Sequence, residues 1–287
     1  MEYVKLNNGV EMPILGFGVY QIPKEDTKRC VLDALKVGYR AIDTAQSYFN
    51  EQQVGEAIKE SGIARNEIFV TSKVWIDNYG YEKCRKSVLN SLEKMGLDYI
   101  DLMLLHQPFA DYYGAYKALE DLYAEGKIRA IGVSNFYPDR LSDICLFGRK
   151  VIPAINQVEV NPLNAQYEAQ KNMEKYGVHI EAWAPFGEGR NGLFDNEVLI
   201  NIGKKYNKSS AQVILRWLIE RGVIIACKST HIERMEENLN VFDFSLAEED
   251  KEEIKKLNTE NSLFFNHQDP NMVDWFDKMV VVRREKQ

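Results

Sequence analysis

Residues 81–105 read YEKCRKSVLNSLEKMGLDYIDLMLL, and this stretch decides the predicted fold. Its first part places apolar side chains at helical spacing on one side. These side chains are Val88, Leu89, Leu92 and Met95. Gly96 follows, and a glycine directly after a helix is a common stop signal. The run at 100–105 is short and almost continuously apolar, which is typical of a strand buried on both faces, so a helix and a parallel strand are expected.

The same alternation of a charged, amphipathic stretch and a short apolar run recurs along the chain. One of the amphipathic stretches, at 25–36, predicts a helix. The apolar runs lie at 14–18, 39–43, 68–73, 100–105, 128–133, 154–158, 179–183 and 223–227. Glycines end several of the stretches between them: Gly38, Gly62, Gly96, Gly126, Gly177 and Gly222. Eight strands alternating with helices predict an α/β fold, a closed (β/α)8 TIM barrel, as one domain over residues 1–287. A doubly wound open sheet is the alternative, weakened because no GxGxxG follows an early strand.

Both ends of the chain depart from this alternation. Asn8-Gly9 separates the short segments 3–6 and 10–12, which predicts an N-terminal β-hairpin that caps the bottom of the barrel. Beyond Leu257 the pattern breaks down into a short C-terminal tail, which either packs on the outside or folds over the barrel mouth. The tail carries Phe264, Phe265, His267 and Trp275.

Composition narrows the class of protein. The 287 residues carry a net charge of -7, which argues against a general nucleic-acid binder and against adhesion to acidic lipid. No apolar run has the length of a bilayer span, and the first residues lack the pattern of a signal peptide. The cysteines are Cys30, Cys84, Cys145 and Cys227. They are far apart and away from the histidines, so we expect reduced thiols, no metal site and a cytoplasmic protein, and a monomer because nothing marks an interface.

Polar side chains end the apolar runs. They are Asp43, Lys73, His106, Ser134, Asn135, Asn156, Gln157 and Lys228, with Tyr48 shortly after the first of them. Each one alone has an ordinary explanation, such as a helix cap, a solvated strand end or a satisfied core histidine. Because the carboxyl ends of barrel strands converge on one site, the set as a whole predicts a shared functional site.

These residue types suit one chemistry. A lysine and an aspartate at adjacent strand ends can form a buried ion pair, and an ammonium group near a tyrosine hydroxyl lowers the pKa of the phenol. A tyrosine with a pKa near ~10 is a poor proton shuttle at neutral pH, whereas one with a lowered pKa is a usable general acid. A neutral histidine nearby can donate a hydrogen bond to a carbonyl oxygen. The set therefore predicts protonation of a carbonyl group while hydride arrives at its carbon.

In their order and spacing, these motifs resemble the aldo-keto reductases over nearly the whole chain. The matching segments are LGFG at 15–18, YRAIDTA at 39–45, Tyr48 with NE at 50–51, VTSKVW at 70–75, LDYIDL at 97–102, LHQP at 105–108, GKIRAIGVSNF at 126–136, NQVE at 156–159, and KS at 228–229 with Arg234, Glu237 and Asn238. Trp183 stands where the family often has tyrosine. With this tryptophan the chain resembles the bacterial and lower-eukaryote branch of the family, which includes 2,5-diketo-gluconate reductases.

The resemblance implies a catalytic tetrad of Asp43, Tyr48, Lys73 and His106. Tyr48 would be the general acid, Lys73 held by Asp43 would tune it, and His106 would orient the substrate carbonyl. It also implies that the nicotinamide of NADPH lies against the flat aromatic face of Trp183. The alternative is that Trp183 only packs in the core. The nicotinamide carboxamide would then be bound by Ser134, Asn135 and Gln157.

Two further segments bear on the cofactor through the same resemblance. Gly187 and Gly189 belong to a glycine-rich loop that would fold over the pyrophosphate, with a flexible surface loop as the alternative. A lysine and an arginine at the start of a helix suit a 2′-phosphate, which favours NADPH over NADH. That cluster comprises Lys228, Ser229 and Arg234, with Asn238 on the adenine and Glu237 as a further cofactor-binding residue.

The substrate pocket is expected to be open and suited to small carbonyls. Gln107 replaces the tryptophan that many members carry after the histidine, and the loop at 109–113 is short, whereas large steroid-type pockets use longer loops. Candidate apolar walls are Tyr20, Trp75, Phe109 and Trp275.

Three functions remain open at this point. The first is NADPH-dependent reduction of small aldehydes and ketones, including dicarbonyls or keto-sugars. The second is an NADPH-binding regulatory subunit with slow turnover, because potassium-channel β-subunits resemble this family too. The third is an unrelated barrel enzyme such as a phosphate-handling isomerase, which would need a phosphate site but no Tyr-Lys-His set.

Overall fold

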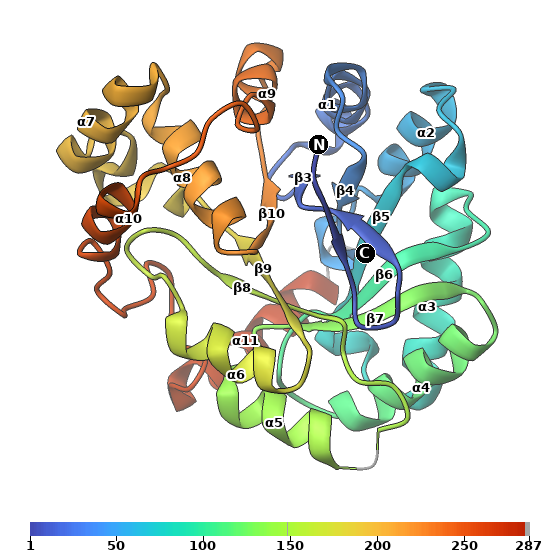
Figure 1. Ribbon diagram of the computed structural model, residues 1–287. Coiled ribbons are helices and arrows are strands. Elements are labelled where there is room, and N and C mark those ends of the chain that lie inside the picture. The colour runs from blue at the N-terminus through green and yellow to red at the C-terminus, as the bar shows by residue number, and fades with distance from the viewer. Residues whose placement is uncertain (148, 285–287) are drawn as a thin grey trace.

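The computed structural model describes residues 1–147 and 149–284, and eight parallel strands close into a barrel in the order β10-β3-β4-β5-β6-β7-β8-β9 (Figure 1). The strands are β3 (Leu15–Gly18), β4 (Ala41–Asp43), β5 (Phe69–Val74), β6 (Ile100–Leu105), β7 (Ile128–Ser134), β8 (Ile155–Glu159), β9 (His179–Trp183) and β10 (Ile224–Cys227). Each strand lies on one of the predicted apolar runs, with ends that differ by at most two residues. The closed barrel is therefore confirmed, and the open sheet is wrong.

Helices surround the barrel. They are α1 (Lys24–Val37), α2 (Glu51–Glu60), α3 (Tyr81–Met95), α4 (Tyr112–Ala124), α5 (Pro138–Leu146), α6 (Tyr167–Lys175), α7 (Glu197–Tyr206), α8 (Ser210–Glu220), α9 (Ile232–Leu239), α10 (Glu248–Lys255) and α11 (Pro270–Arg284), with short 3-10 turns η1 (Gln46–Tyr48), η2 (Arg65–Glu67), η3 (Ile76–Asn78) and η4 (Gly187–Asp195). All six glycines predicted to end helical stretches adopt positive φ. In α3 the predicted apolar face is buried at Val88, Leu92 and Met95, whereas Leu89 is exposed.

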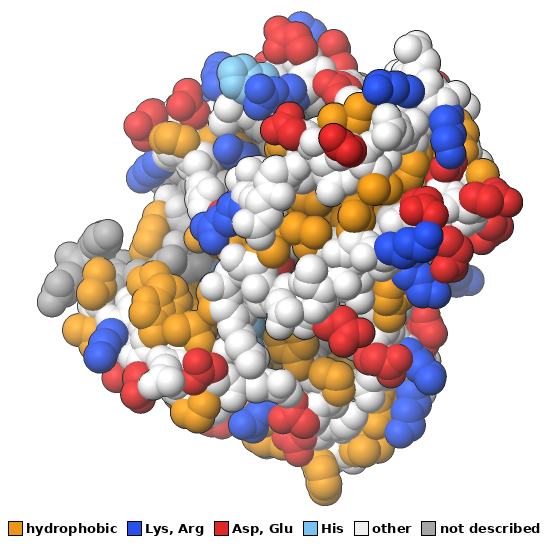
Figure 2. Space-filling view, turned by 90° about the vertical axis from the view of Figure 1, so that its left-hand side faces the viewer, with side chains coloured by type: hydrophobic (Ala, Val, Ile, Leu, Met, Phe, Trp, Pro, Cys, Tyr) orange, Lys and Arg blue, Asp and Glu red, His pale blue; other side chains and the backbone are white. Residues whose placement is uncertain are grey.

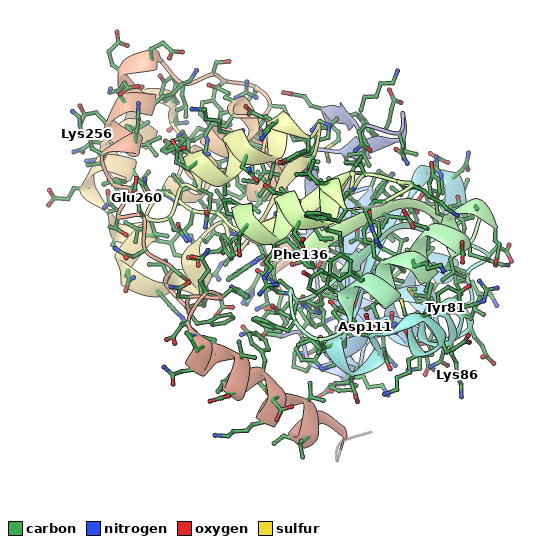
Figure 3. The ribbon with its side chains drawn as sticks, turned by 90° about the horizontal axis from the view of Figure 1, so that it is seen from below. Tyr81, Lys86, Asp111, Phe136, Lys256 and Glu260 are labelled. Atoms are coloured by element: carbon green, nitrogen blue, oxygen red, sulfur yellow. The ribbon has the colours of Figure 1, made fainter. Side chains whose placement is uncertain are left out.

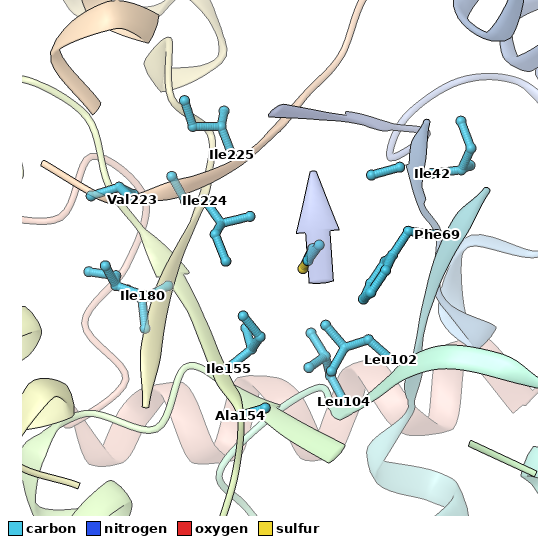
Figure 4. Close-up of a cluster of buried hydrophobic side chains, with 14 of the residues drawn as sticks. Ile42, Phe69, Leu102, Leu104, Ala154, Ile155, Ile180, Val223, Ile224 and Ile225 are labelled. Atoms are coloured by element: carbon cyan, nitrogen blue, oxygen red, sulfur yellow. The ribbon is translucent and has the colours of Figure 1, made fainter. Parts of the chain in front are cut away.

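The interior of the barrel is an apolar core. Figure 4 shows side chains from several strands meeting there, among them Phe69, Leu102, Leu104 and Ile224. Gly132 in β7 is required by this packing, because a Cβ at that position would lie 2.8 Å from the carbonyl oxygen of Ile155. Each large apolar side chain buried in this way stabilises the fold by ~1.5–3 kcal/mol.

The N-terminal hairpin closes the bottom of the barrel, as predicted. Its strands β1 (Tyr3–Lys5) and β2 (Glu11–Pro13) pair antiparallel. The Asn8 side-chain amide donates a hydrogen bond to the Arg129 carbonyl oxygen at 2.8 Å, near the start of β7. The hairpin and α11 lie at opposite ends of the barrel, which Figures 1 and 3 show from two directions.

The C-terminal segment, which is the chain beyond Leu257, folds over the barrel mouth and does not pack on the outside of the barrel. The expected short tail contains the fifteen-residue helix α11, which the sequence analysis missed. Phe276 and Val280 of this helix form a small apolar cluster with Trp75, which follows β5.

Acidic and basic side chains are interspersed over the face seen in Figure 2. Among the described residues, no helix is long and apolar enough to cross a membrane.

Candidate active site

A pocket of about 430 Å³ opens at the carboxyl ends of the barrel strands. Strand ends, the loop after β9 and the C-terminal segment together form its lining. Predicted site residues in that lining are Tyr20, Asp43, Tyr48, Trp75, His106, Ser134, Asn135, Gln157, Trp183, Gly189, Lys228, Arg234 and Trp275. Residues that are scattered in the sequence therefore converge on one cavity, as the barrel topology requires.

Lys73 lies beneath the pocket floor and joins three of the four predicted tetrad members. Its ammonium nitrogen is 2.5 Å from Asp43 Oδ1 and 3.3 Å from the Tyr48 hydroxyl. It also donates to the Thr44 carbonyl oxygen at 3.0 Å, a contact that the sequence did not indicate. Lys73 is fully buried in β5, while η1 carries Tyr48 to the pocket. A buried ammonium with three oxygen partners keeps its charge and its orientation.

His106, at the end of β6, completes the set. Its ring lies edge-on to the Tyr48 ring with 5.7 Å between centroids, and edge-on to the Trp75 ring at 5.3 Å. Ser47 Oγ lies 3.4 Å from Nδ1 of His106, a contact that the sequence analysis missed. Tyr48 and His106 both line the pocket, so a ligand oxygen placed there can meet both side chains.

The ionisation of the site differs from the expectation. Burial raises the pKa of Tyr48 to about 12, although Lys73 pulls it down. The prediction of a lowered pKa is therefore wrong in its net direction, because loss of water around the phenolate outweighs the nearby ammonium. Burial alone would lower the pKa of Lys73, but Asp43 and Tyr48 raise it overall. At neutral pH the Tyr48 phenol is thus protonated and the neighbouring Lys73 is charged.

A cluster of amides lies beside the tetrad. Asn135 follows β7 with a left-handed φ of 64°, and its Oδ1 accepts a hydrogen bond from Trp183 Nε1 at 2.9 Å. Ser134 Oγ donates to the Gln157 carbonyl oxygen at 2.8 Å, and Gln157 Nε2 donates to Asp43 Oδ2 at 2.9 Å. A half-buried indole face held beside three amide or hydroxyl groups fits a flat ring that carries a carboxamide, as nicotinamide does.

The basic residues expected at the 2′-phosphate lie at the edge of the same pocket. Lys228 and Arg234 are exposed there, and within the described part of the chain neither forms an ion pair with a carboxylate. Ser229 is buried, and its hydroxyl donates to the carbonyl oxygen of His231 at 3.1 Å. Two cations without protein counter-ions are suited to an anionic group.

Four predicted cofactor residues lie outside the pocket lining: the buried Ser229, and Gly187, Glu237 and Asn238. The Glu237 carboxylate accepts a hydrogen bond from Ser209 at the start of α8. Asn238 is buried in α9. Gly187 has a positive φ, and a Cβ there would lie 2.8 Å from Leu263 Cδ1. The left-handed backbone conformation thus favours glycine here without any bound phosphate.

The pocket walls contain more aromatic residues than the sequence analysis named. Of the predicted wall, Phe109 lies one layer behind, with its ring 5.2 Å from Phe276 and 6.3 Å from His267. The wall residues that were missed are Phe186, Phe194, Phe264, Phe265, Phe276 and Met279. They come from the loop after β9 and from the C-terminal segment. These residues do not lie at the carboxyl end of a strand, which was the criterion that collected the other site residues. The aromatic content of the tail pointed only to Phe264 and Phe265.

Proton donation to a carbonyl oxygen, next to a platform for a flat redox ring, is carbonyl oxidoreductase chemistry, and the barrel and its site define that class. The sequence model of the aldo/keto reductase family matches residues 14–259. The chain belongs to the aldo/keto reductase family. Membership excludes the unrelated barrel isomerase.

Individual relatives agree with this assignment. Glyoxal reductase from Bacillus subtilis is 48% identical over 257 residues, which cover 89% of this chain and 92% of the relative. The crystal structure of an aldo/keto reductase from Brucella melitensis matches with a TM-score of 0.86 and 42% identity, over 89% of this chain and 99% of that one. The Bombyx mori aldo-keto reductase in complex with NADP matches with a TM-score of 0.89 and 34% identity, over 96% and 97% of the two chains.

The chain is therefore an enzyme, an aldo/keto reductase. The alternative of a slow regulatory subunit is not favoured, since the relatives are named as reductases.

Proposed function

We propose that Tyr48 is the proton donor in the reduction of small aldehydes and ketones by this enzyme, with Asp43, Lys73 and His106 as its partners. The observation that carries the proposal is the contact of 3.3 Å between the Tyr48 hydroxyl and the buried Lys73 ammonium. NADPH, when bound, supplies the hydride. The protein must then deliver a proton to the carbonyl oxygen and stabilise the charge that develops there.

Each side chain has one task in this scheme. Tyr48 releases its proton to the carbonyl oxygen, and the Lys73 ammonium stabilises the phenolate left behind. Asp43 holds Lys73 in place and balances its charge in the buried site. His106, whose ring lies 5.7 Å from that of Tyr48, donates a hydrogen bond that orients the carbonyl. Positioned acid catalysis of this kind contributes ~10²–10⁴ in rate.

Ser134, Asn135, Gln157 and Trp183 would hold the nicotinamide end of the cofactor. Trp183 provides the flat face, and the Asn135 side chain fixes its indole edge. Gly187 and Gly189 in the loop after β9 would border the pyrophosphate. At the other end Lys228 and Arg234 would bind the 2′-phosphate, with Ser229, Glu237 and Asn238 beside the adenosine. The absence of a carboxylate partner for either cation in the described chain supports this assignment.

The substrate class follows from the pocket. A volume of about 430 Å³ bounded by aromatic rings suits a small carbonyl compound next to the cofactor. The similarity to a glyoxal reductase adds small dicarbonyls to the candidates, and keto-sugars remain among them. Tyr20, Trp75 and Trp275 would contact the substrate, with Phe109 supporting the wall from behind.

The experiment is a screen of glyoxal, simple aldehydes and keto-sugars with NADPH and NADH side by side, followed at the absorbance of the reduced cofactor. Tyr48→Phe serves as the blank for each substrate. We expect dicarbonyls and small aldehydes to show the highest kcat/KM with NADPH. Turnover in the Tyr48→Phe protein equal to wild type would contradict the proton-donor role.

We also propose that the enzyme acts in the cytoplasm as a monomer that takes no nucleic acid or membrane partner. Its cysteines Cys30, Cys84, Cys145 and Cys227 are all unpaired and buried, which is compatible with a reducing compartment. Light scattering of the purified protein at micromolar concentration tests the oligomeric state. A mass of two chains would overturn the monomer.

A further inference from the structure

Gln107 follows His106 directly and links the pocket to the C-terminal segment. Its side-chain oxygen Oε1 lies 2.9 Å from Nε2 of His267 and 3.3 Å from Nδ2 of Asn135. Gln107 and His267 are both buried, although they are far apart in sequence. A buried side-chain bridge of this kind ties the segment that follows α10 to the end of strand β6.

The direction of every hydrogen bond in this bridge follows from one donor. An indole N–H can only donate, so Trp183 Nε1 requires the oxygen of the Asn135 amide, 2.9 Å away. The nitrogen of that amide then faces the carbonyl oxygen of His106 at 3.1 Å and the side chain of Gln107. Gln107 must therefore present its oxygen, and His267 must carry its proton on Nε2.

His267 is enclosed by aromatic rings. The centroid of its ring lies 4.8 Å from that of Phe265, 5.5 Å from Tyr137, 6.0 Å from Phe276 and 6.3 Å from Phe109. Its second nitrogen, Nδ1, has no hydrogen-bond partner among the described residues. Burial lowers the pKa of His267 to about 3, so the ring is neutral and the bond to Gln107 is its one polar attachment in the described structure.

Two polar attachments of the C-terminal segment lie next to the aromatic pocket wall. Glu159, at the end of β8, accepts hydrogen bonds from Ser262 Oγ at 2.5 Å and from the Leu263 backbone N–H at 3.0 Å. His267 provides the second attachment. The pocket-lining aromatic residues of the segment flank these two points: Phe264, Phe265, Trp275 and Phe276. Figure 3 shows that α11 extends away from the barrel body, and its buried side chains Phe276 and Val280 hold it against Trp75.

We propose that His267 and Gln107 are positioning residues of the reductase: their hydrogen bond fixes the aromatic pocket wall and, through Asn135, the indole of Trp183. The inference rests on the proposed function of the pocket. It assigns no catalytic step to either side chain. Without the bond, the wall and the Asn135 amide lose their shared anchor, so binding of substrate and cofactor weakens while the tetrad beneath remains intact.

Kinetics of His267→Phe, which keeps an aromatic ring but removes the donor, test this directly. We expect KM for 4-nitrobenzaldehyde to rise about tenfold and Kd for NADPH about threefold, consistent with loss of a net hydrogen bond and of local order. kcat should stay within about twofold, because no group of the tetrad is touched. His267→Gln, which can donate to the same oxygen, should restore most of the loss. Gln268→Leu, on the exposed neighbouring residue, is the matched control.

A double-mutant cycle with Gln107→Leu separates the bridge from a general loss of folding. If the two side chains act through one bond, the double variant has a KM no higher than the worse single variant. Additive effects, or a KM for His267→Phe within about twofold of wild type, would overturn the inference. Should His267→Phe not fold, the comparison of His267→Gln with Gln107→Leu decides the same question. Failure of the wild-type enzyme to reduce the aldehyde would instead count against the proposed function.

Discussion

Gln157 Nε2 donates a hydrogen bond to Asp43 Oδ2 at 2.9 Å. The other oxygen of the same carboxylate binds the Lys73 ammonium at 2.5 Å. Asp43 therefore joins the residues that handle the proton to an amide that would hold the cofactor. Because both oxygens are used inside the protein, the carboxylate is fixed before any ligand arrives, and the site is preorganised.

Replacement of Tyr48 by phenylalanine removes the proton donor and leaves the ring packing. We expect kcat to fall by ~10²–10⁴, the usual contribution of positioned acid catalysis. Kd for NADPH, measured by the change in protein fluorescence, should stay within about twofold because Trp183 and the amide cluster are untouched. A fall in NADPH affinity that matches the fall in kcat would show a damaged pocket instead.

Lys73→Met tests the buried ion pair. The variant leaves the Asp43 carboxylate buried with Gln157 as its remaining side-chain partner, and breaking a buried pair in this way costs ~3–5 kcal/mol. Lys251→Met is the control, since Lys251 pairs with Glu220 near the surface and such pairs contribute ~0–1 kcal/mol. Urea unfolding followed by circular dichroism measures both. Equal losses in the two variants would contradict the role assigned to the pair.

The pH profile of kcat/KM reports the ionisation of Tyr48. The acid must be protonated to act, so activity is lost as the pH rises through its pKa, which burial raises to about 12. At saturating NADPH we expect no decline attributable to the phenol below about pH 10, where the protonated form still dominates. A decline in kcat/KM centred near neutral pH, not caused by weaker NADPH binding, would contradict this prediction. It would show that the pKa of Tyr48 is lowered, as expected from the lysine alone.

The sequence predicted the barrel well because its signals are local. Continuous apolar runs and helix-ending glycines each identify their own element, and the strand-end rule then collects residues such as Asp43 and His106 into one site. The net pKa of Tyr48 could not be predicted, since it depends on how much water three-dimensional packing removes. The bridge between Gln107 and His267 has no local signal either, because the C-terminal segment had no periodicity to place it over the mouth.

Arg234→Ala should separate the two nicotinamide cofactors. If its guanidinium binds the 2′-phosphate, KM for NADPH rises by ~10-fold or more, as expected for a lost charge-assisted contact, while KM for NADH changes little. Lys59→Ala, at an exposed lysine of α2, is the control for net charge. Both variants are assayed with one aldehyde and both cofactors. Equal increases for NADPH and NADH in Arg234→Ala would remove the 2′-phosphate assignment.

The stability of the enzyme should fall on acidification partly because of His267. Burial lowers the pKa of this ring from 6.5 to about 3, so between these values the unfolded chain binds a proton that the folded chain does not. The free energy of unfolding therefore falls as the pH drops below the unfolded value, by ~1.4 kcal/mol per pH unit.

Comparison of a His267 variant with a control variant isolates the contribution of His267 to the pH dependence of stability. His267→Gln keeps a donor for Gln107 but cannot titrate, so its unfolding free energy should fall less steeply between about pH 6 and pH 4 than that of wild type. Gln268→Leu replaces the exposed, uncharged neighbour of His267 and should follow the wild-type slope. Urea titrations at several pH values give both slopes, and groups common to all three proteins cancel in the differences. If His267→Gln loses stability as steeply as wild type, the folded protein admits a proton to His267, and the enclosed neutral ring described above does not exist in solution.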